Sequence, residues 1–466
     1  MGTDPISKIK ARLPSSRERL THLRASKEDE PTSDPKTMGG ITKDYYSDVW
    51  KRDANAKSYE ECLEEISDVE PIIPPDRGPP DRSPRAPDLD MFIDVIHETN
   101  NSCAGPDGIH FSYYRTYTAL DSSLAQALCD ACRLMSGGRL PPEGFNYARF
   151  FLIPKKTGGL IQDTRGISVA NAENRIMASA GAKAIENALR NYISPWQKGF
   201  VPGREGKDHI TGLVGEFYRC ANEGTQRHVL LLDMKRAFDT MSHSFIHACL
   251  KQLGFPDWFR RLVGGLLHHV VVIPAFSSDP AHFIRILRGV KQGCPLSPLL
   301  FVICFDIFLR RLSAIEGLSL HAFADDLAMA AKVVKTILRG LREARVFGTF
   351  SGLEINQVKT VLVSALKPSL KSRTAFDQLG WECIKFVKEA VYLGLLFGRD
   401  VSTVDVFRPA FNKFNDRLRR IASVIKTSSL HDRITIFNVF LLPLFYYLGQ
   451  FLVIPWAQVA APVQAL

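Results

Sequence analysis

Two adjacent carboxylates inside a short apolar run constrain the fold of this chain more than any other feature. The run Leu320–Met329 places Asp325 and Asp326 between two apolar segments, where a two-residue hairpin turn would fall. Aspartate tolerates turn geometry well, so the run predicts a β-hairpin. Like charges held side by side repel each other, and a fold that fixes them there usually supplies cations as compensation.

A third carboxylate follows a second apolar run. Val229–Leu232 predicts a buried strand that ends at Asp233. Neighbouring central strands of one sheet would bring Asp233 to the acidic hairpin. Three carboxylates from two strand ends can hold two hard divalent ions, as in-line phosphoryl transfer requires. Taken by itself, the Asp-Asp pair has an alternative interpretation as a solvated turn without catalytic function.

Composition narrows the class of protein. Hydrophobic residues make up 45% of the 466 residues, which is typical of a globular chain. The net charge of +10 favours a polyanionic partner such as nucleic acid. Nine cysteines without a signal peptide favour reduced thiols and an intracellular location.

Two pairs of residues, of types that often bind metal ions, are interpreted as structural. Cys129 and Cys132 form a single CxxC pair, expected on one helix face, and His243 and His247 are expected to be surface helix residues. A nearly continuous apolar segment, residues 434–454, is close to the length of a membrane span. Its polar and helix-breaking residues favour buried helices instead, with a transmembrane helix as the alternative.

The pattern along the chain predicts an α+β fold. Residues 1–90 are rich in charged residues, Ser and Pro, and we predict a polar, largely flexible extension with one short helix near Asp44–Arg52. Helices are predicted over Arg175–Tyr192 and Ser244–Leu253. Ser297 is predicted to cap a third, buried helix, with Pro298 at its first position. Helices alternate with carboxylate-bearing strands, which favours an antiparallel sheet backed by helices.

Eight short motifs, among them Asp233–Asp239 and Phe323–Asp326, resemble in sequence and order those of reverse transcriptases of LINE-type (non-LTR) retrotransposons. Asp233–Asp239 resembles the first palm motif, and Phe323–Asp326 resembles the second carboxylate motif. Arg288–Phe301 is similar to the Gly- and Gln-rich loop that leads into the palm helix. The other matches are Ala104–Gly108, Ile153–Lys156, Gln197–Phe200, Gly352–Asn356 with Lys359–Thr360, and Tyr392–Gly394. The resemblance covers about residues 90–455.

This resemblance implies a right-hand polymerase with a palm, fingers and a partial helical thumb, acting as an RNA-directed DNA polymerase. Asp233, Asp325 and, more peripherally, Asp326 would be catalytic and bind two Mg²⁺ or Mn²⁺ ions. These ions would activate a primer 3′-hydroxyl and neutralise the triphosphate. Phe238 would exclude a 2′-hydroxyl and so favour deoxynucleotides, with a core aromatic as the alternative. Asp239 is expected to brace the turn.

Further residues are expected to bind the nucleotide. Lys155 and Arg165 lie in a predicted β-hairpin, residues 151–167, that would fold over the triphosphate, and whether Lys155 or Lys156 makes the contact stays open. The family has proline where this chain has glycine at 166, which is expected to loosen the backbone. In the Gly- and Gln-rich loop, Gly289, Gln292 and Gly293 would approach the nucleotide and template; a plain interdomain turn is the alternative.

Two cationic regions complete the expected sites. Lys359 would neutralise the pyrophosphate, with a solvated lysine as the equal alternative. Residues 411–420 begin a basic helical region in which Arg417, Arg419 and Arg420 would grip the primer–template duplex. A solvated charged helix is the alternative there.

The predicted domains are the extension (1–90), fingers (91–205), palm (206–400) and a truncated thumb-like region (401–466). The expected partners are an RNA template, a DNA primer and deoxynucleotides, with no membrane, in the nucleus or a cytoplasmic ribonucleoprotein. No endonuclease or zinc module is recognised, so endonuclease activity would have to come from outside this chain. The alternatives are a group II intron-type reverse transcriptase and a catalytically silent nucleic-acid-binding relic.

Overall fold

The computed structural model describes residues 20–73, 84–426, 428–455 and 457. The chain divides into two compact units, each of which gathers stretches that are distant in the sequence. Unit 2 comprises Arg19–Gly206 and Leu232–Thr360, and unit 1 contains Lys207–Leu231 and Val361–Leu466. Both units contain helices and strands, which confirms the α+β prediction. The units do not follow the predicted fingers, palm and thumb boundaries, which stay a proposal.

The N-terminal stretch is folded where the structure describes it, so the prediction of a largely flexible extension is wrong for residues 20–73. Helix α2 (Pro35–Trp50) begins after Asp34, whose carboxylate accepts a hydrogen bond from the Thr37 N–H at 2.8 Å. An Asp cap followed by Pro in the first turn is a strong start signal. Residues 1–19 and 74–83 of the predicted extension, including most of its Pro-rich end, lie outside the described residues.

Aromatic side chains fix α2 on a four-stranded sheet of unit 2. Tyr46 and Trp50, one helical turn apart, are both 3% exposed and contact the Phe150 ring at 4.7 and 5.2 Å between centroids. The sheet order is β2-β1-β5-β6. β1 pairs antiparallel with β2, which confirms the predicted hairpin, and parallel with β5. The strands are β1 (Tyr147–Pro154), β2 (Thr164–Ala170), β5 (Val271–Pro274) and β6 (Ile284–Arg285).

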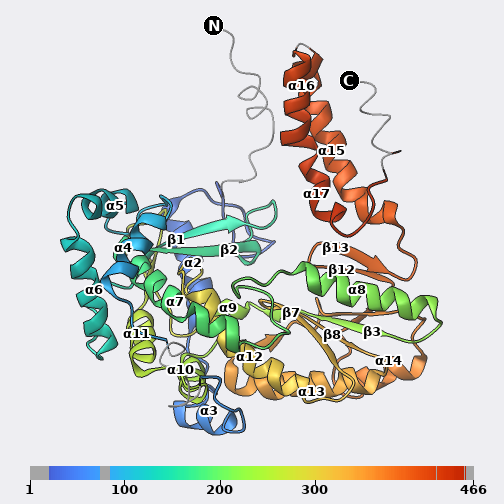
Figure 1. Ribbon diagram of the computed structural model, residues 1–466, viewed down its shortest axis with the longest axis horizontal. Coiled ribbons are helices and arrows are strands. Elements are labelled where there is room, and N and C mark those ends of the chain that lie inside the picture. The colour runs from blue at the N-terminus through green and yellow to red at the C-terminus, as the bar shows by residue number, and fades with distance from the viewer. Residues whose placement is uncertain (1–19, 74–83, 427, 456, 458–466) are drawn as a thin grey trace. The chain divides into compact units, whose positions relative to one another are not determined.

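A layer of helices lies beside this sheet (Figure 1). It consists of α4 (Leu89–Glu98), α5 (Phe111–Leu120), α6 (Ser123–Ser136), α7 (Ala172–Tyr192) and α11 (Asp257–Leu267). Helix α7 confirms the helix predicted from the apolar stripe. Cys129 and Cys132 are buried on α6, as expected for residues of one helix face.

A hairpin and three helices form the rest of the unit 2 core. The strands β7 (Ser319–Phe323) and β8 (Asp326–Ala331) pair antiparallel, which confirms the predicted hairpin. The helices are α10 (His243–Gln252), α12 (Ser297–Ser313) and α13 (Val334–Ser351). Every residue of α12 from Leu300 to Leu309 is buried, as predicted. Its cap prediction was wrong by one position, because Leu296 occupies the N-cap and Ser297 is already helical.

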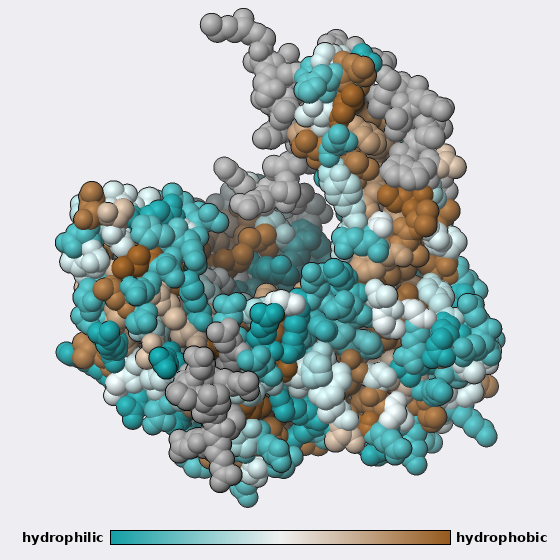
Figure 2. Space-filling view, viewed as in Figure 1, coloured by the Kyte–Doolittle hydropathy of each residue, from teal (hydrophilic) through white to brown (hydrophobic). Residues whose placement is uncertain are grey.

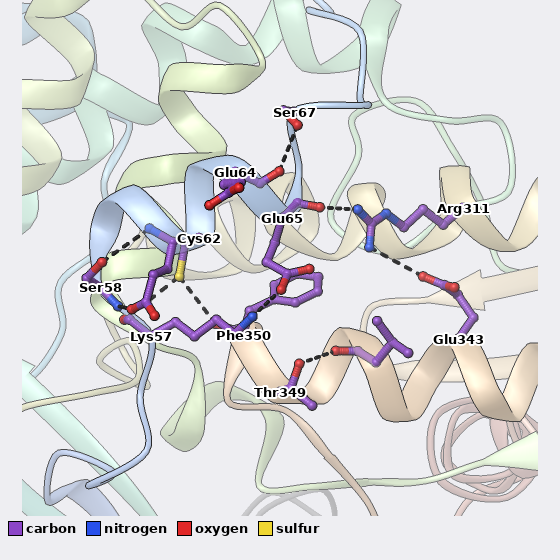
Figure 3. A network of polar contacts seen from close by, with 12 residues as sticks. Lys57, Ser58, Cys62, Glu64, Glu65, Ser67, Arg311, Glu343, Thr349 and Phe350 are labelled. Carbon is purple, nitrogen blue, oxygen red and sulfur yellow. Dashed lines mark hydrogen bonds and ion pairs between the residues drawn. The ribbon is translucent and has the colours of Figure 1, made fainter.

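Polar contacts fix helix α3 (Tyr59–Glu65) on the helices that pack against this hairpin (Figure 3). Arg311 of α12 donates to the Glu65 carbonyl and pairs with Glu343 of α13 at 3.5 Å. The Cys62 thiol donates to the Phe350 carbonyl of α13 at 3.7 Å. The N-terminal stretch is therefore an integral part of unit 2.

Unit 1 has its own strands and helices. Strand β3 (His228–Leu232) pairs antiparallel with β10 (Val361–Ser364), and β10 pairs parallel with β11 (Lys385–Val387). Strand β3 confirms the apolar strand predicted before Asp233. The remaining elements are α8 (Lys207–Asn222), α14 (Leu370–Asp377) and the hairpin of β12 (Glu389–Tyr392) with β13 (Leu395–Gly398).

The C-terminal part of unit 1 is helical. Phe407, Phe411 and Phe414 of α15 (Thr403–Lys426) contact Phe445 of α17 (Pro443–Gly449). Between them lie α16 (Leu430–Ile436) and the π-helix η3 (Phe437–Leu441). Apolar side chains also gather on the exposed surface of α15–α17, shown brown in Figure 2. Among the described helices, none combines the length and apolar character that a membrane crossing requires.

Candidate active site

A large open cavity in unit 2 collects most of the residues that the sequence singled out. Its volume is about 1100 Å³. One carboxylate comes from the end of the predicted strand and one from the acidic hairpin, and they are joined by the cationic and loop residues predicted to bind a nucleotide. From that set, the lining includes Asp233, Asp325, Lys155, Arg165, Phe238, Gln292, Gly293 and Lys359.

The acidic turn projects Asp325 into this cavity. Phe323 pairs with Asp326 in the hairpin, so the two turn residues are Ala324 and Asp325. The sequence prediction placed the turn one residue too late, since Asp326 is the first residue of β8. Ala324 has a positive φ of 55°, at a turn position that glycine normally takes. The two adjacent aspartates therefore belong to different parts of the hairpin.

The three carboxylates influence one another electrostatically. Partial burial raises the pKa of Asp325, and the charge of Asp233 raises it further. Asp326 has an exposed side chain, yet partial burial of its carboxyl, together with the charges of Asp325 and Asp233, raises its pKa to about 6. Raised pKa values in neighbouring carboxyls indicate a site that favours positive charge.

The donor set suits a hard divalent cation. Among the described residues, no group of three or more His, Cys, Asp or Glu side chains is arranged to hold a metal ion. Mg²⁺, however, is usually bound by one or two carboxylates together with substrate phosphates and water, rather than by an all-protein cage. Asp233 and Asp325 line one cavity and so fit that mode of binding.

The segment after α13 holds the backbone of Asp233. The Asp233 N–H donates to the Thr360 hydroxyl at 3.2 Å, and its carbonyl accepts from the Asn356 N–H at 2.8 Å. The next two residues form β4 (Met234–Lys235), which pairs with β9 (Glu354–Ile355). These contacts fix the Asp233 backbone and the two residues that follow it.

Phe238 lies in a tight turn after Asp233. Arg236 has a positive φ of 49° and precedes the single helical turn α9 (Ala237–Thr240). The half-buried Phe238 ring stacks on Phe301 of α12, with centroids 4.6 Å apart and planes at 21°. The ring is therefore packed on the core and also lines the cavity. Its predicted contact with the sugar stays a prediction.

The Gly- and Gln-rich loop packs against this turn. Gly289 has a positive φ of 82°, and a Cβ there would lie 2.4 Å from the Asp239 carbonyl oxygen. The Val290 N–H donates to the Phe238 carbonyl at 2.7 Å, and the Gln292 side chain donates to the Asp239 carboxylate at 3.3 Å. Gly293, with a φ of 114°, lies against Ser168 of β2. The loop therefore joins the turn after Asp233 to the β1–β2 hairpin.

Asp239 anchors the base of the cavity. Burial raises its pKa to about 6, against the opposing effects of the Arg236 charge and of hydrogen bonds from Trp50 and Gln292. His243 of α10 contacts the loop through a hydrogen bond between its Nε2 and the Gly289 carbonyl at 2.8 Å. His243 and His247 are half-buried, so the prediction that they are surface residues was wrong.

Cations occupy the side of the cavity formed by the β1–β2 hairpin. Partial burial lowers the pKa of Lys155, and the charges of Arg165 and Lys359 lower it further. Lys156 instead pairs with Asp163 at 3.5 Å, and of the two lysines only Lys155 lines the cavity. A Cβ on Gly166 would lie 2.2 Å from the Phe150 ring, so the close packing here favours glycine. The expected loosening of this hairpin stays a prediction.

Helix α2 forms a wall of the cavity that the sequence analysis missed. Tyr45, Tyr46, Asp48 and Val49 line it. The Arg236 guanidinium lies over the Tyr45 ring, 4.6 Å from its centroid. Burial raises the pKa of Tyr46 to about 12, so its phenol stays neutral at physiological pH. The short helix predicted near Asp44–Arg52 overlaps the C-terminal part of α2, and the Asp34 cap was the available signal for its earlier start.

The three arginines predicted to bind a duplex lie on α15 of unit 1. Arg417 donates to the Phe440 carbonyl at 2.8 Å, and Arg420 pairs with Asp416 at 2.9 Å. The side chain of Arg419 is exposed. Two of the three are therefore engaged in local contacts.

Comparisons with known proteins agree with this geometry. The sequence model of the family described as "Reverse transcriptase (RNA-dependent DNA polymerase)" matches residues 153–396. The chain is 25% identical over 395 residues to a protein named "Transposon TX1 uncharacterized 149 kDa protein" from Xenopus laevis, covering 82% of this chain and 29% of that protein.

Two further relatives carry retrotransposon names. A "Retrovirus-related Pol polyprotein from type-1 retrotransposable element R2" from Popillia japonica is 30% identical over 277 residues, covering 55% of this chain and 38% of that protein. One from the "type-2 retrotransposable element R2DM" of Drosophila melanogaster is 31% identical over 237 residues, covering 48% and 22%. The chain thus spans less than half the length of each of these relatives.

Proposed function

The chain belongs to the reverse transcriptase family, in its non-LTR retrotransposon branch, and on that basis we propose that it is an RNA-directed DNA polymerase. It would add deoxynucleotides to a primer 3′-hydroxyl on an RNA template. The single observation that carries the proposal is the shared cavity of unit 2, which unites Asp233 and Asp325 with the cations of the β1–β2 hairpin. Carboxylates opposite cations are what a metal-bound triphosphate requires.

Asp233 and Asp325 would bind two Mg²⁺ or Mn²⁺ ions, with Asp326 at the periphery. When bound, the ions would lower the pKa of the primer hydroxyl and neutralise the charge on the leaving pyrophosphate. Lys155 and Arg165 would hold the triphosphate oxygens from the opposite side. Lys359 would neutralise the pyrophosphate, since its charge already acts on Lys155 across the cavity.

The base of the cavity would select the nucleotide. The Phe238 ring, supported from below by Phe301, would occupy the space that a 2′-hydroxyl needs. Gln292 and Gly293 would lie against the nucleotide and template. Because Gln292 is hydrogen-bonded to Asp239, the loop and the turn that bears Phe238 would move together.

Two alternatives make different predictions. A group II intron-type reverse transcriptase would share the cavity, but the relatives found are named as TX1 and R2 retrotransposon proteins. A silent nucleic-acid-binding relic would retain binding without extension. The location would be intracellular, in the nucleus or a cytoplasmic ribonucleoprotein, which is supported by nine cysteines that are all free.

Primer extension on poly(rA)–oligo(dT) with Mg²⁺ or Mn²⁺ tests the proposal. We expect incorporation that is lost in Asp325→Asn, by a factor of about 10³ or more, because the ions lose a ligand charge. Binding of the duplex, measured by fluorescence anisotropy, should persist in the variant. Duplex binding without extension by the unaltered protein under either metal would support the relic instead.

A further inference from the structure

A glutamine that does not line the cavity contacts the strained residue of the acidic turn. Gln197 is fully buried, at 0% exposure. Its Oε1 accepts hydrogen bonds from the Ala324 N–H at 2.8 Å and the Gly199 N–H at 2.9 Å. Its Nε2 donates to the Ala324 carbonyl at 3.1 Å. One amide side chain thus satisfies both backbone groups of Ala324.

The conformation of Ala324 explains why such contacts are needed. A residue with a Cβ is strained in the left-handed region, and the first position of such a two-residue turn normally takes glycine. Both backbone groups of Ala324 are also buried, where an unpaired group is costly. The Gln197 amide offsets both costs, and the next residue after Ala324 is Asp325.

Gln197 itself is held by a rigid support. The Lys198 N–H donates to the Ala322 carbonyl at 2.9 Å, so the segment runs along β7. The Arg204 guanidinium donates to four backbone carbonyls, those of Arg190, Ile193, Ser194 and Gln197. The buried carboxylate of Asp306 on α12 accepts from the Ser194 N–H at 2.9 Å. Any shift of Gln197 would therefore have to disturb α7 and α12.

The backbone at Gly199 packs directly on the acidic turn. A Cβ on Gly199 would lie 2.2 Å from the Ala324 nitrogen, so the two segments are in direct backbone contact. The following residue, Phe200, has a positive φ of 54° and presents its ring to Phe238 at 6.4 Å between centroids. The same short segment thus contacts the acidic turn and the residue proposed to select the sugar.

We propose that Gln197 is a positioning residue, which fixes Ala324 and through it the direction of the Asp325 carboxylate. This inference rests on the proposed polymerase function and deepens it, because it assigns a role at that site to a residue that touches neither nucleotide nor metal. The reaction depends on the placement of Asp325 relative to Asp233. Loss of the amide therefore lowers turnover rather than nucleotide affinity.

The test compares Gln197→Met with Gln226→Met. Gln226 is a matched control in unit 1, because its side chain also pairs with both backbone groups of one distant residue, Leu366. Its Oε1 likewise accepts from a nearby backbone N–H, that of Arg227. We expect Gln197→Met to lower kcat in primer extension by about 10- to 100-fold, as a misplaced catalytic group does. The KM for dTTP should change by less than about threefold, and Gln226→Met should leave both constants near those of the unaltered protein.

Hydrogen–deuterium exchange of the peptide covering residues 320–329 provides a readout that does not need activity. It should become faster in Gln197→Met and not in Gln226→Met. Should Gln197→Met fail to fold, Gln197→Glu keeps the acceptor oxygen, loses the Nε2 donor and is expected to lower kcat in the same direction. An unchanged kcat and exchange rate, or equal losses in both methionine variants, would overturn the role of Gln197. Absence of extension by the unaltered protein would instead reject the polymerase proposal, while the exchange comparison still decides whether Gln197 fixes the turn.

Discussion

The cavity of unit 2 and the helical end of unit 1 hold their charged residues in different ways. In the cavity, backbone contacts fix the segments that bear the functional side chains. The Asp233 backbone bonds to Thr360 and Asn356, and Ala324 bonds to Gln197. On α15, by contrast, two of the three arginine side chains are themselves engaged, as in the hydrogen bond from Arg417 to Phe440.

This difference separates two kinds of site. A side chain whose backbone is fixed, and whose polar end faces a cavity, is available for chemistry on a ligand. A side chain whose polar end is already bonded within the protein mainly contributes stability. Asp325 belongs to the first kind and Arg417 to the second, although both were selected from the sequence on the same basis of charge and motif position.

Among the changes that test this comparison, the largest effect is expected at Gly289, where the loop packs directly on the turn after Asp233. In Gly289→Ala, the added Cβ would meet the Asp239 carbonyl oxygen at 2.4 Å, in a backbone conformation with a φ of 82° that disfavours any side chain. The turn that bears Phe238 must then shift, so we expect kcat/KM in primer extension to fall about 100-fold. Gly215→Ala on α8, where nothing lies within 4 Å of the added atom, is the control and should retain activity. Equal activities of the two variants would show that the loop is a plain turn.

A smaller and more selective effect is expected at Phe238. Replacing it by alanine removes the ring that lines the cavity but leaves Phe301 to close the core beneath it. We expect the preference for dTTP over UTP to fall roughly 10- to 100-fold, measured as the ratio of the two kcat/KM values. The kcat/KM for dTTP should fall by a smaller factor than the ratio does. If the ratio is unchanged while thermal stability drops, the ring is only a core aromatic.

The same contrast explains which parts could be predicted from sequence. The β7–β8 hairpin, β3 and α12 follow from local patterns, namely alternating or continuous apolar residues with clear start signals. The turn position was missed by one residue because Ala324 takes the left-handed position that the sequence pattern assigns to glycine or aspartate. The role of Gln197 could not be predicted, since it depends on pairing with a residue 127 positions away. Helix α2 was underestimated because its buried face is narrow and lies in a polar, Pro-rich stretch.

The smallest effects distinguish Arg417 from Arg419 on α15. Arg417→Ala removes a hydrogen bond from a charged donor to the Phe440 carbonyl, and the loss is expected to cost about 1–2 kcal/mol of stability. It should lower the melting temperature and leave the salt dependence of duplex binding nearly unchanged. Arg419→Ala removes an exposed charge, so it should leave the melting temperature unchanged. If Arg419 contacts a phosphate, its loss should reduce the slope of log affinity against log salt by about one.

Measuring duplex affinity at several salt concentrations, together with thermal unfolding, separates these two outcomes. A reduced salt slope in Arg417→Ala with unaltered stability would place this arginine among the ligand-binding residues and remove the distinction between the two regions. An unchanged slope in Arg419→Ala would mean that α15 is a solvated charged helix at this position. The two side chains lie on one helix, two residues apart. They differ because the Arg417 guanidinium already donates a hydrogen bond to a protein carbonyl, whereas the Arg419 side chain is exposed.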